Sequence, residues 1–262
     1  MASPKEAEAP PLTGGSASVP DPTGQALLPL RVNQLVYSVS GTALIRGIDL
    51  TLEAGPRTVI MGANGAGKSL LLRLLHGLLR PTSGTIAWGQ AGWGTATRRR
   101  QAMVFQRPVL LRRSVRANLR FALGLRPSSS KDRSQRLARL LELAGLSEVA
   151  SRPARVLSAG EQQRLALVRA LGLEPEVLLL DEPTASLDPA AVAAIESLIH
   201  TADSQGAKIM LVTHDIGQAR RIADEVVFVH HGRIAEHTPA EEFFARPRSE
   251  PARAYLEGRL VL

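Results

Sequence analysis

The chain has 262 residues, of which 44% are hydrophobic, and it contains no cysteine. Its length allows one large domain with a substantial core, and the lack of cysteine excludes disulfides, thiolate metal sites and cysteine nucleophiles. No apolar run approaches the roughly 18–20 residues that a membrane-spanning helix needs, so any role at a membrane is expected to depend on a partner. The net charge is +8, but aromatic residues make up only 3% and the arginines are dispersed. This pattern favours a solvated basic surface and no nucleic-acid partner.

The first 29 residues differ from the rest in composition. They contain six prolines together with glycine, serine and threonine. Such a segment cannot bury enough apolar surface to offset its ordering entropy. We therefore expect a disordered tail over residues 1–29 and a folded domain over 30–262.

Strand-like patterns dominate the first part of that domain. The segments are apolar, β-branched or alternating, which is typical of strands. The expected strands are Leu30–Tyr37, Ile45–Leu52, Val59–Met61 and Gly84–Trp88. A helix is predicted from Lys68 to about Leu79, where Pro81 follows.

The middle of the chain changes character. Helical spacing recurs over Ser114–Leu123 and Ser134–Ala144 with no strand signal between them, which predicts a helical insertion over about 107–160. Strand and helix signals then alternate again, which predicts an α/β fold with a largely parallel sheet covered by helices. These later segments are Val177–Leu180, Ala190–Ser204, Lys208–Val212, Gly217–Ala223 and Val226–Val229.

A glycine-rich run after the third expected strand carries the clearest chemical signal. Gly62-Ala63-Asn64-Gly65-Ala66-Gly67-Lys68-Ser69 fits the pattern G-x-x-x-x-G-K-[ST] and leads into a leucine-rich helix. In this context backbone N–H groups and the positive end of the helix dipole cradle a polyphosphate. Lys68 would then contact the β- and γ-phosphates and the Ser69 hydroxyl would bind Mg²⁺. The alternative is a glycine-rich turn before a core helix.

Two acids follow a second apolar strand. Val177–Leu180 leads directly into Asp181 and Glu182, and the carboxyl ends of strands are where α/β sheets bind ligands. Asp181 would help to hold Mg²⁺, and Glu182 would polarise the attacking water. The alternative is an acid pair that caps the next helix.

A turn of small residues opens the helix predicted over Gln162–Gly172. The turn, Leu157-Ser158-Ala159-Gly160-Glu161, has the exposed N–H groups, serine and glycine of an anion site. It is locally just as consistent with a capping box between Ser158 and Glu161. The local sequence leaves both interpretations open.

Together these segments resemble the nucleotide-binding subunit of an ABC transporter over about residues 30–245. Gly62–Ser69 is similar to the Walker A motif, Leu178–Glu182 to Walker B, and Leu157–Glu161 to the LSGGQ signature. Gln106 is similar to the Q-loop glutamine, Ala185–Asp188 to the D-loop and His214 to the switch histidine. Tyr37 is placed like the aromatic residue that stacks on adenine.

The resemblance implies a P-loop NTPase core with an antiparallel β subdomain and an inserted helical subdomain. It implies a head-to-tail homodimer that holds ATP and Mg²⁺ between Walker A of one copy and the signature of the other. Glu182, His214 and Gln106 would be catalytic, and Ser69, Gln106 and Asp181 would hold the metal. The nucleotide-binding set would be Tyr37, Gly62, Asn64, Gly65, Ala66, Gly67, Lys68, Ser69, Leu70, Ser158, Gly160 and Asp188, with Asp188 coupling the two sites.

The chain departs from the family pattern at three positions. Ala159 stands where the signature usually has glycine, Glu161 replaces glutamine, and Leu70 replaces the threonine that usually follows Ser69. An added methyl group at Ala159 would crowd the loop if that position needed a positive φ. Loss of a hydroxyl at Leu70 removes one hydrogen bond, worth about 0.5–1.5 kcal/mol, to the α-phosphate.

The resemblance also implies partners. We expect a separate membrane permease, an indirect periplasmic solute-binding protein and a peripheral position on the cytoplasmic face of the membrane. Five arginines after the Q-loop lie where a permease helix docks in the family: Arg107, Arg112, Arg113, Arg116 and Arg120. They would face acids on that helix or form a solvated helix face.

Three segments are similar to tungstate and phosphate importer ATPases. They are Phe105–Leu111, Asp215–Asp224 and Ala254–Arg259. They favour tungstate as the solute, with molybdate or phosphate next. The alternative is a non-transport ABC ATPase, such as the scaffold ATPase of iron–sulfur cluster assembly.

Overall fold

The computed structural model describes residues 26–90 and 92–259. Most of the tail expected over 1–29 therefore lies outside the described residues. The folded part nevertheless begins before Leu30, because Leu27 is only 2% exposed and packs into an apolar core with Leu30 and Trp88. Among the described residues, no helix combines the length and the apolar character needed to cross a bilayer.

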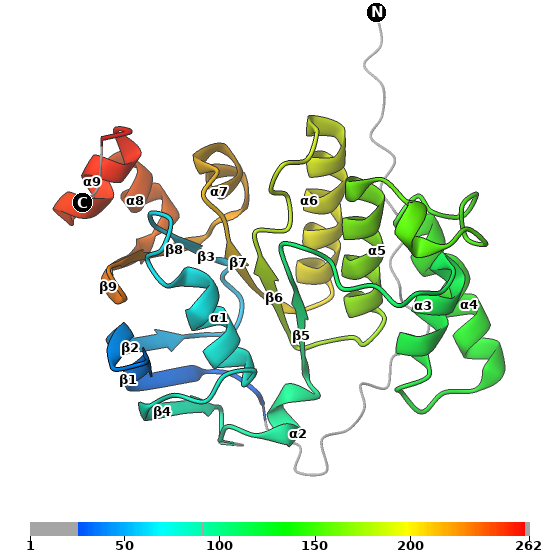
Figure 1. The fold of residues 1–262 in the computed structure, drawn as a ribbon, viewed down its shortest axis with the longest axis horizontal. Helices are drawn as coiled ribbons and strands as arrows, with labels where there is room; N and C mark the ends of the chain where they lie inside the picture. The colour runs from blue at the N-terminus through cyan, green and yellow to red at the C-terminus, as the bar shows by residue number, and fades with distance from the viewer. Residues whose placement is uncertain (1–25, 91, 260–262) are drawn as a thin grey trace, which may run out of the picture.

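Two β-sheets and their helices make up the part of the chain that the structure describes (Figure 1). The strands are β1 Leu30–Val39, β2 Thr42–Leu52, β3 Thr58–Met61, β4 Ser83–Trp88, β5 Gln101–Val104, β6 Val177–Asp181, β7 Lys208–Val212, β8 Glu225–His230 and β9 Arg233–Pro239. The helices are α1 Lys68–His76, α2 Thr95–Arg98, α3 Val115–Leu123, α4 Ser130–Leu143, η1 Ala154–Val156, α5 Ala159–Leu171, α6 Pro189–Ser204, α7 Ile216–Ile222, α8 Ala240–Ala245 and α9 Glu250–Leu256.

The larger sheet has the order β5-β6-β7-β3-β8-β9, and all its pairs are parallel except β8 with β9. Every residue of β3, β6 and β7 is buried, as expected of a sheet covered on both faces. In β6, Leu178 and Leu180 face one apolar core while Val177 and Leu179 face the other. The parallel order brings the carboxyl ends of β3, β5, β6 and β7 to one edge, where the predicted site residues follow.

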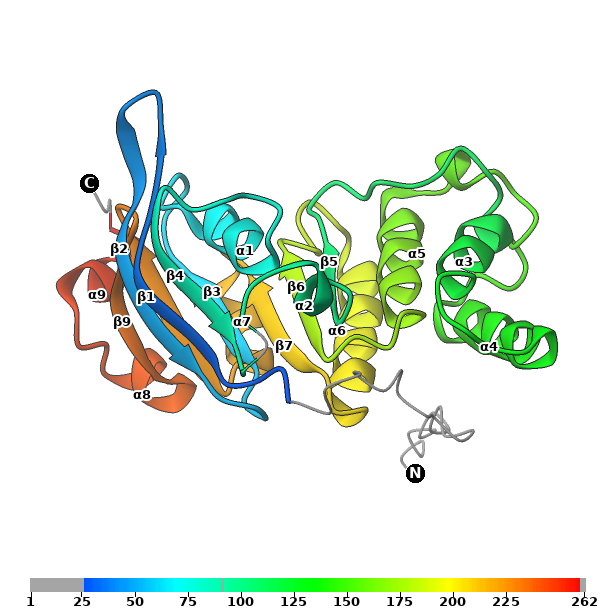
Figure 2. The same cartoon turned by 90° about the horizontal axis from the view of Figure 1, so that it is seen from below.

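The smaller sheet, β2-β1-β4, is antiparallel and lies against α1 (Figure 2). Leucines of α1 share a core with residues of this sheet on one side and with Ile60 and Leu179 of the larger sheet on the other. The antiparallel β subdomain implied by the sequence is therefore present, and α1 is fixed between the two sheets.

The helical insertion, which contains α3 and α4, packs on α5 at the far side of the larger sheet (Figures 1 and 2). Glu174, in the turn before β6, anchors it. The guanidinium of Arg136 lies 2.5 Å from the Glu174 carboxylate, and Arg126 pairs with the same carboxylate. Two arginines of the insertion therefore form ion pairs with one glutamate of the α/β core.

Three helix ends differ clearly from the expected ones. Helix α1 ends at His76 rather than near Leu79, because Gly77 takes a left-handed conformation with φ +87° and caps the helix. Helix α4 begins at Ser130 rather than Ser134, because the Ser129 hydroxyl accepts a hydrogen bond from the Asp132 amide. Helix α5 begins within the signature turn, at Ala159, rather than at Gln162.

Candidate active site

The glycine-rich run forms the loop between β3 and α1. Gly62 has φ +144°, and a Cβ added there would lie 2.1 Å from the backbone oxygen of Val229. Only glycine therefore allows the loop to pass this close to β8. Asn64 and Gly65 are exposed at the tip, while Ala66 is buried. The loop opens outward with the start of α1 directly behind it, which suits a polyphosphate ligand.

Lys68 is the buried cation of this loop. Its side-chain amino group donates to the backbone oxygens of Gly62, at 2.7 Å, and Ala63, at 2.9 Å, and the residue is 5% exposed. Burial lowers the pKa of Lys68, while the carboxylates of Glu182 and Asp181 oppose that effect. The ammonium group is thereby held in the concave side of the loop, where an anionic ligand would contact it.

Ser69 and Asp181 come together from α1 and the end of β6. The Ser69 hydroxyl donates to Asp181 Oδ1 at 2.6 Å, and a guanidinium nitrogen of Arg73 lies 3.7 Å from Asp181 Oδ2. Asp181 is 3% exposed, and burial raises its pKa, although the Ser69 hydrogen bond and Arg73 lower it. A buried carboxylate that still has a raised pKa, beside a hydroxyl, fits Mg²⁺, which prefers oxygen ligands and would supply the missing positive charge.

Glu182 lies at the centre of a second cluster. Its Oε2 accepts a hydrogen bond from Gln106 Nε2 at 3.3 Å and lies 3.2 Å from His214 Nδ1. Gln106 follows β5, Glu182 follows β6 and His214 follows β7, so adjacent strand ends bring the three together. Glu182 has φ +46°, an unusual conformation for a residue with a side chain, and its amide is held by the Val212 oxygen at 3.0 Å. The arrangement can orient a water molecule for attack on a phosphoryl group.

Tyr37 and Leu70 lie beside the glycine-rich loop. Tyr37 pairs in register with Ile45, whose Cδ1 would be 2.8 Å from a Cβ added at Gly67. Tyr37 is half-buried. Leu70 packs against the core that contains α1, and it offers no hydroxyl to the loop.

The turn before α5 forms the capping box that the sequence allowed. The Ser158 hydroxyl accepts from the Glu161 amide at 3.3 Å, and the Ser158 amide donates to Glu161 Oε2 at 2.7 Å. Hydrogen bonding of the Glu161 carboxylate by Ser158, first by its backbone amide and then by its side chain, lowers the pKa of Glu161. Ala159 is the first helical residue and is not among the described residues with positive φ, so its methyl group adds no backbone strain. Glu161, which stands where the family usually has glutamine, therefore contributes its carboxylate to this capping box.

Gly160 and Asp188 bring the starts of α5 and α6 together. A Cβ added at Gly160 would lie 2.8 Å from the Ala191 Cβ, and Asp188 caps α6 by accepting from the Ala191 amide at 2.9 Å. Figures 1 and 2 show α5 and α1 on opposite sides of β5 and β6. Ser158, Gly160 and Asp188 therefore form a group separate from the loop that holds Lys68.

Two further residues join the site without having been identified from the sequence. Arg73 reaches Asp181 because it lies four residues after Ser69 and so shares its helix face, a spacing that would have revealed it. Gln163 is 2% exposed and donates from Nε2 to the Phe105 backbone oxygen at 3.1 Å. This contact joins α5 to the segment that carries Gln106, and no motif indicates it.

Comparisons with known proteins decide the family. The sequence model described as "ABC transporter" matches residues 45–185. The chain belongs to the ABC transporter family. It is an ATP-binding subunit of the kind found in ABC importers, an ATPase coupled to transport that binds ATP with Mg²⁺.

Relatives of known function align over most of this ABC subunit. The phosphate import ATP-binding protein PstB 2 of Natronomonas pharaonis is 38% identical, covering 88% of this chain and 87% of the relative. The tungstate uptake ATP-binding protein TupC of Peptoclostridium acidaminophilum is 38% identical, and the alignment covers 82% of this chain and 99% of the relative. The nickel import ATP-binding protein NikO of Rhodobacter capsulatus is 42% identical, covering 80% and 89%.

Solved structures share the fold. CbiO1 of Clostridium perfringens, part of an ABC transporter complex, superimposes with a TM-score of 0.75 at 31% identity, covering 85% of this chain and 92% of that one. A dimeric ATP-binding cassette bound to ADP and Pi superimposes with a TM-score of 0.72 at 26% identity, covering 80% and 98%. The fold class expected from the sequence is confirmed.

Proposed function

We propose that this ABC subunit hydrolyses ATP to energise the uptake of an oxyanion through a separate membrane permease. Tungstate is the favoured solute, with molybdate or phosphate next. The observation that carries the catalytic part is the position of Glu182, held by Gln106 and His214 beside the Ser69–Asp181 pair. The subunit would lie on the cytoplasmic face of the membrane, and a periplasmic solute-binding protein would act indirectly through the permease.

We assign the roles as follows. Backbone amides of the glycine-rich loop and the Lys68 ammonium bind the phosphates, while Tyr37 stacks on the base. Ser69, Asp181 and Gln106 hold Mg²⁺, which neutralises phosphate charge when bound. Glu182 polarises the attacking water, and His214 orients that water and the γ-phosphate. Phosphoryl transfer depends mostly on positioning and charge neutralisation, and this set is the contribution of one chain to both.

The functional unit would be a homodimer. Ser158, Gly160 and Asp188 lie apart from the Lys68 loop within one chain, so a second copy facing head to tail would bring its own Ser158 and Gly160 to the nucleotide. The dimeric cassette bound to ADP and Pi, with which this chain shares its fold, supports that arrangement. ATP-dependent dimerisation of the purified chain, measured by light scattering with and without Mg²⁺, tests it.

The solute proposal is supported by relatives named as importers of phosphate, of tungstate and, in Haloferax volcanii, of an anion, each 35–38% identical. Relatives named as nickel and methionine importers have 38–42% identity, and these solutes are the competing candidates. The test is to reconstitute the chain with its permease and binding protein and to measure ATPase stimulation by tungstate, molybdate, phosphate, nickel and methionine. Stimulation by nickel or methionine alone would overturn the proposal. Purification with soluble partners and no membrane protein would favour the iron–sulfur scaffold alternative.

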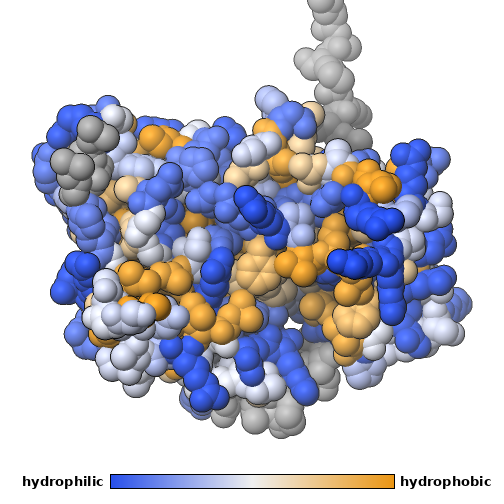
Figure 3. Space-filling view, in the orientation of Figure 1, coloured by the Kyte–Doolittle hydropathy of each residue, from blue (hydrophilic) through white to orange (hydrophobic). Residues whose placement is uncertain are grey.

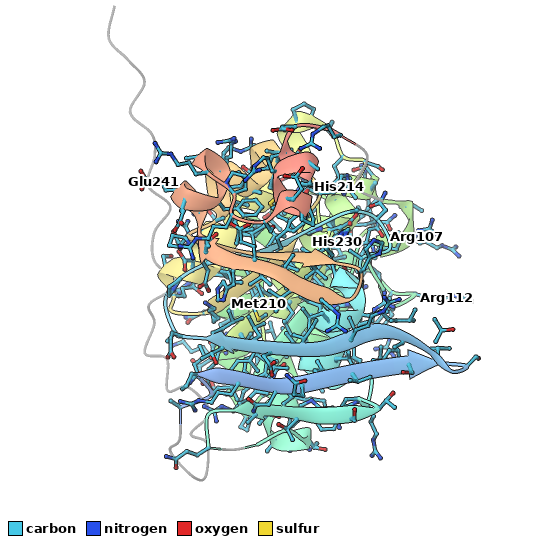
Figure 4. The ribbon with its side chains drawn as sticks, turned by 90° about the vertical axis from the view of Figure 1, so that its left-hand side faces the viewer. Arg107, Arg112, Met210, His214, His230 and Glu241 are labelled. Atoms are coloured by element: carbon cyan, nitrogen blue, oxygen red, sulfur yellow. The ribbon has the colours of Figure 1, made fainter. Side chains whose placement is uncertain are left out.

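The surface proposed for the permease lies on the helical insertion and the segment before it. All five arginines that follow Gln106 and precede Phe121 are exposed, as are Val109 at 67% and Phe121 at 50%. Figure 3 shows apolar side chains beside strongly hydrophilic ones on this side of the molecule. In Figure 4, Arg107 and Arg112 lie on the side opposite Glu241.

Such a surface suits a helix with both apolar and acidic side chains. Reversing the charges of Arg112 and Arg113 to glutamate should weaken copurification with the permease and leave ATP binding unchanged. Arg31→Glu, an exposed change on β1 of the smaller sheet and so outside the insertion, is the matched control. Undiminished permease binding by the double variant would remove the proposal.

A further inference from the structure

A hydroxyl group from the C-terminal helix reaches the histidine loop. Tyr255, in α9, donates from its hydroxyl to the backbone oxygen of His214 at 3.1 Å, although 41 residues separate them. Figure 4 shows His214 beside this helix. The imidazole of the same residue contacts Glu182 Oε2 at 3.2 Å. Tyr255 therefore holds the main chain of the residue whose side chain touches the proposed base.

The aromatic ring of Tyr255 is fixed relative to the phosphate-binding loop. It packs edge-on against Phe228 with the ring centroids 5.4 Å apart. Phe228 is fully buried in β8 and pairs in register with Met61, the residue directly before Gly62. The Tyr255 hydroxyl is thus positioned from the same strands that position the loop.

The start of α9 is anchored as well. The Glu236 carboxylate, in a residue that is 6% exposed, accepts from the Arg248 amide at 3.0 Å and from the Ser249 amide at 2.9 Å. The preceding helix also contacts the helix after His214, since the guanidinium of Arg220 in α7 lies 4.5 Å above the Phe244 ring in α8. The C-terminal helices therefore hold the His214 segment at two points.

We propose that Tyr255 is a positioning residue for ATP hydrolysis, whose hydroxyl fixes the His214 carbonyl and so keeps the imidazole on Glu182. His214 needs such support because its side chain is 55% exposed and the residue lies in the short loop between β7 and α7. Burial, followed by the charges of Glu182 and Asp215, raises the pKa of Tyr255, which keeps the hydroxyl protonated as a donor at neutral pH. This inference rests on the proposed roles of Glu182 and His214.

The direct test is Tyr255→Phe, which keeps the ring on Phe228 and removes only the hydroxyl. Losing one hydrogen bond of this kind should lower kcat about three- to tenfold, with a change in the KM for ATP of less than about twofold because the phosphate-binding groups are untouched. Arg253→Gln, an exposed change on the same helix whose partners are Glu250 and the Pro247 oxygen, is the matched control and should leave both values unchanged.

A double-mutant cycle separates positioning from a general structural role. Single-turnover hydrolysis of radiolabelled ATP at high protein concentration keeps slow variants measurable. If Tyr255 acts through His214, adding Tyr255→Phe to His214→Ala should lower the rate no further. Hydrogen exchange of residues 213–216 should also become faster in Tyr255→Phe.

The outcomes distinguish this inference from the function on which it rests. Wild-type kcat in Tyr255→Phe, or an equal loss in the presence and absence of His214, would overturn the role of Tyr255. Wild-type hydrolysis by His214→Ala would instead overturn the proposed role of His214.

Discussion

The Lys68 loop and the start of α5 are both helix N-termini in one chain, yet they are built differently. At the loop, a buried cation and a buried carboxylate lie close to two further titratable side chains, Glu182 and His214. At α5, Ser158 and Glu161 satisfy each other in a capping box, with no buried charge. In the proposed dimer, the first region would carry the chemistry, and the second would gain a catalytic role only when another copy provides the nucleotide.

The largest effect is expected at Glu182. Glu182→Gln removes the carboxylate proposed to polarise water and should lower kcat about 10²- to 10⁴-fold. ATP binding should persist, so an ATP-bound dimer should accumulate in size-exclusion chromatography. Glu142→Gln, an exposed change on α4, is the control. Hydrolysis at the wild-type rate would refute the assignment of Glu182.

Lys68→Ala should act on binding. Loss of a charged hydrogen-bond donor to phosphate, worth about 1.5–3 kcal/mol, should raise the Kd for ATP about 10- to 100-fold. Lys131→Ala, which removes an exposed lysine on α4, should leave the Kd unchanged. Calorimetric titration with ATP measures both, and an unchanged Kd in Lys68→Ala would place the phosphates elsewhere.

Ser158→Ala tests the start of α5 by comparison with Ser129→Ala, which removes the equivalent N-cap of α4. Ser158 and Ser129 both accept a hydrogen bond from the amide three residues later, so each alanine variant should lose about 1 kcal/mol of stability. Only Ser158→Ala should also lose ATP hydrolysis. Equal activity in the two variants, measured with their thermal unfolding, would reduce Ser158 to a helix cap.

Mixing variants sharpens the same comparison. A dimer of one Lys68→Ala chain and one Ser158→Ala chain contains one site with both an intact Lys68 and an intact Ser158. The mixture should therefore hydrolyse ATP faster than either variant alone. No recovery, despite dimer formation, would argue against a site shared between copies.

The smallest effect is expected at Ala159. Since Ala159 already starts a right-handed helix, Ala159→Gly should change kcat by less than about twofold. A large gain in activity would show that the methyl group obstructs the nucleotide in the dimer.

The strands that the sequence predicted best are those buried on both faces, β3, β6 and β7, because their continuous apolar runs lead directly into functional residues. Strand β5 was missed because it is only four residues long, includes the polar Gln101 and directly follows three arginines. Its parallel pairing with β6, which the local sequence does not show, identifies it as a strand. Strand β9 was missed because its sequence is polar and because, within the described part of the chain, it is an edge strand that pairs with β8 alone. Local pattern carries little information where pairing decides the structure.

The candidate site shows the same division. Motif spacing placed Lys68 and Ser69 at the start of α1 and Asp181 and Glu182 at the end of β6, and the fold brings these two places together. The capping box at Ser158 was one of two open interpretations, and its geometry is confirmed while the contact with nucleotide stays a prediction. The contacts of Gln163 and Tyr255 join segments 58 and 41 residues apart along the chain. Such long-range hydrogen bonds depend on the packed core, and local sequence patterns do not reveal which distant segments meet there.

The contact between Gln163 and the Phe105 oxygen has a consequence for a pair of these chains. Ser158 and Gln163 are five residues apart at one end of a continuous helix, a span of about 7.5 Å over which a helix does not bend appreciably. A displacement of Ser158 by the γ-phosphate bound to the second copy would therefore move the start of α5 as a rigid body. Through the Gln163 contact, it would also move Phe105 and the adjoining Gln106. Through this helix, each site would respond to whether ATP is bound at the opposite site, and the two sites would hydrolyse ATP cooperatively rather than independently.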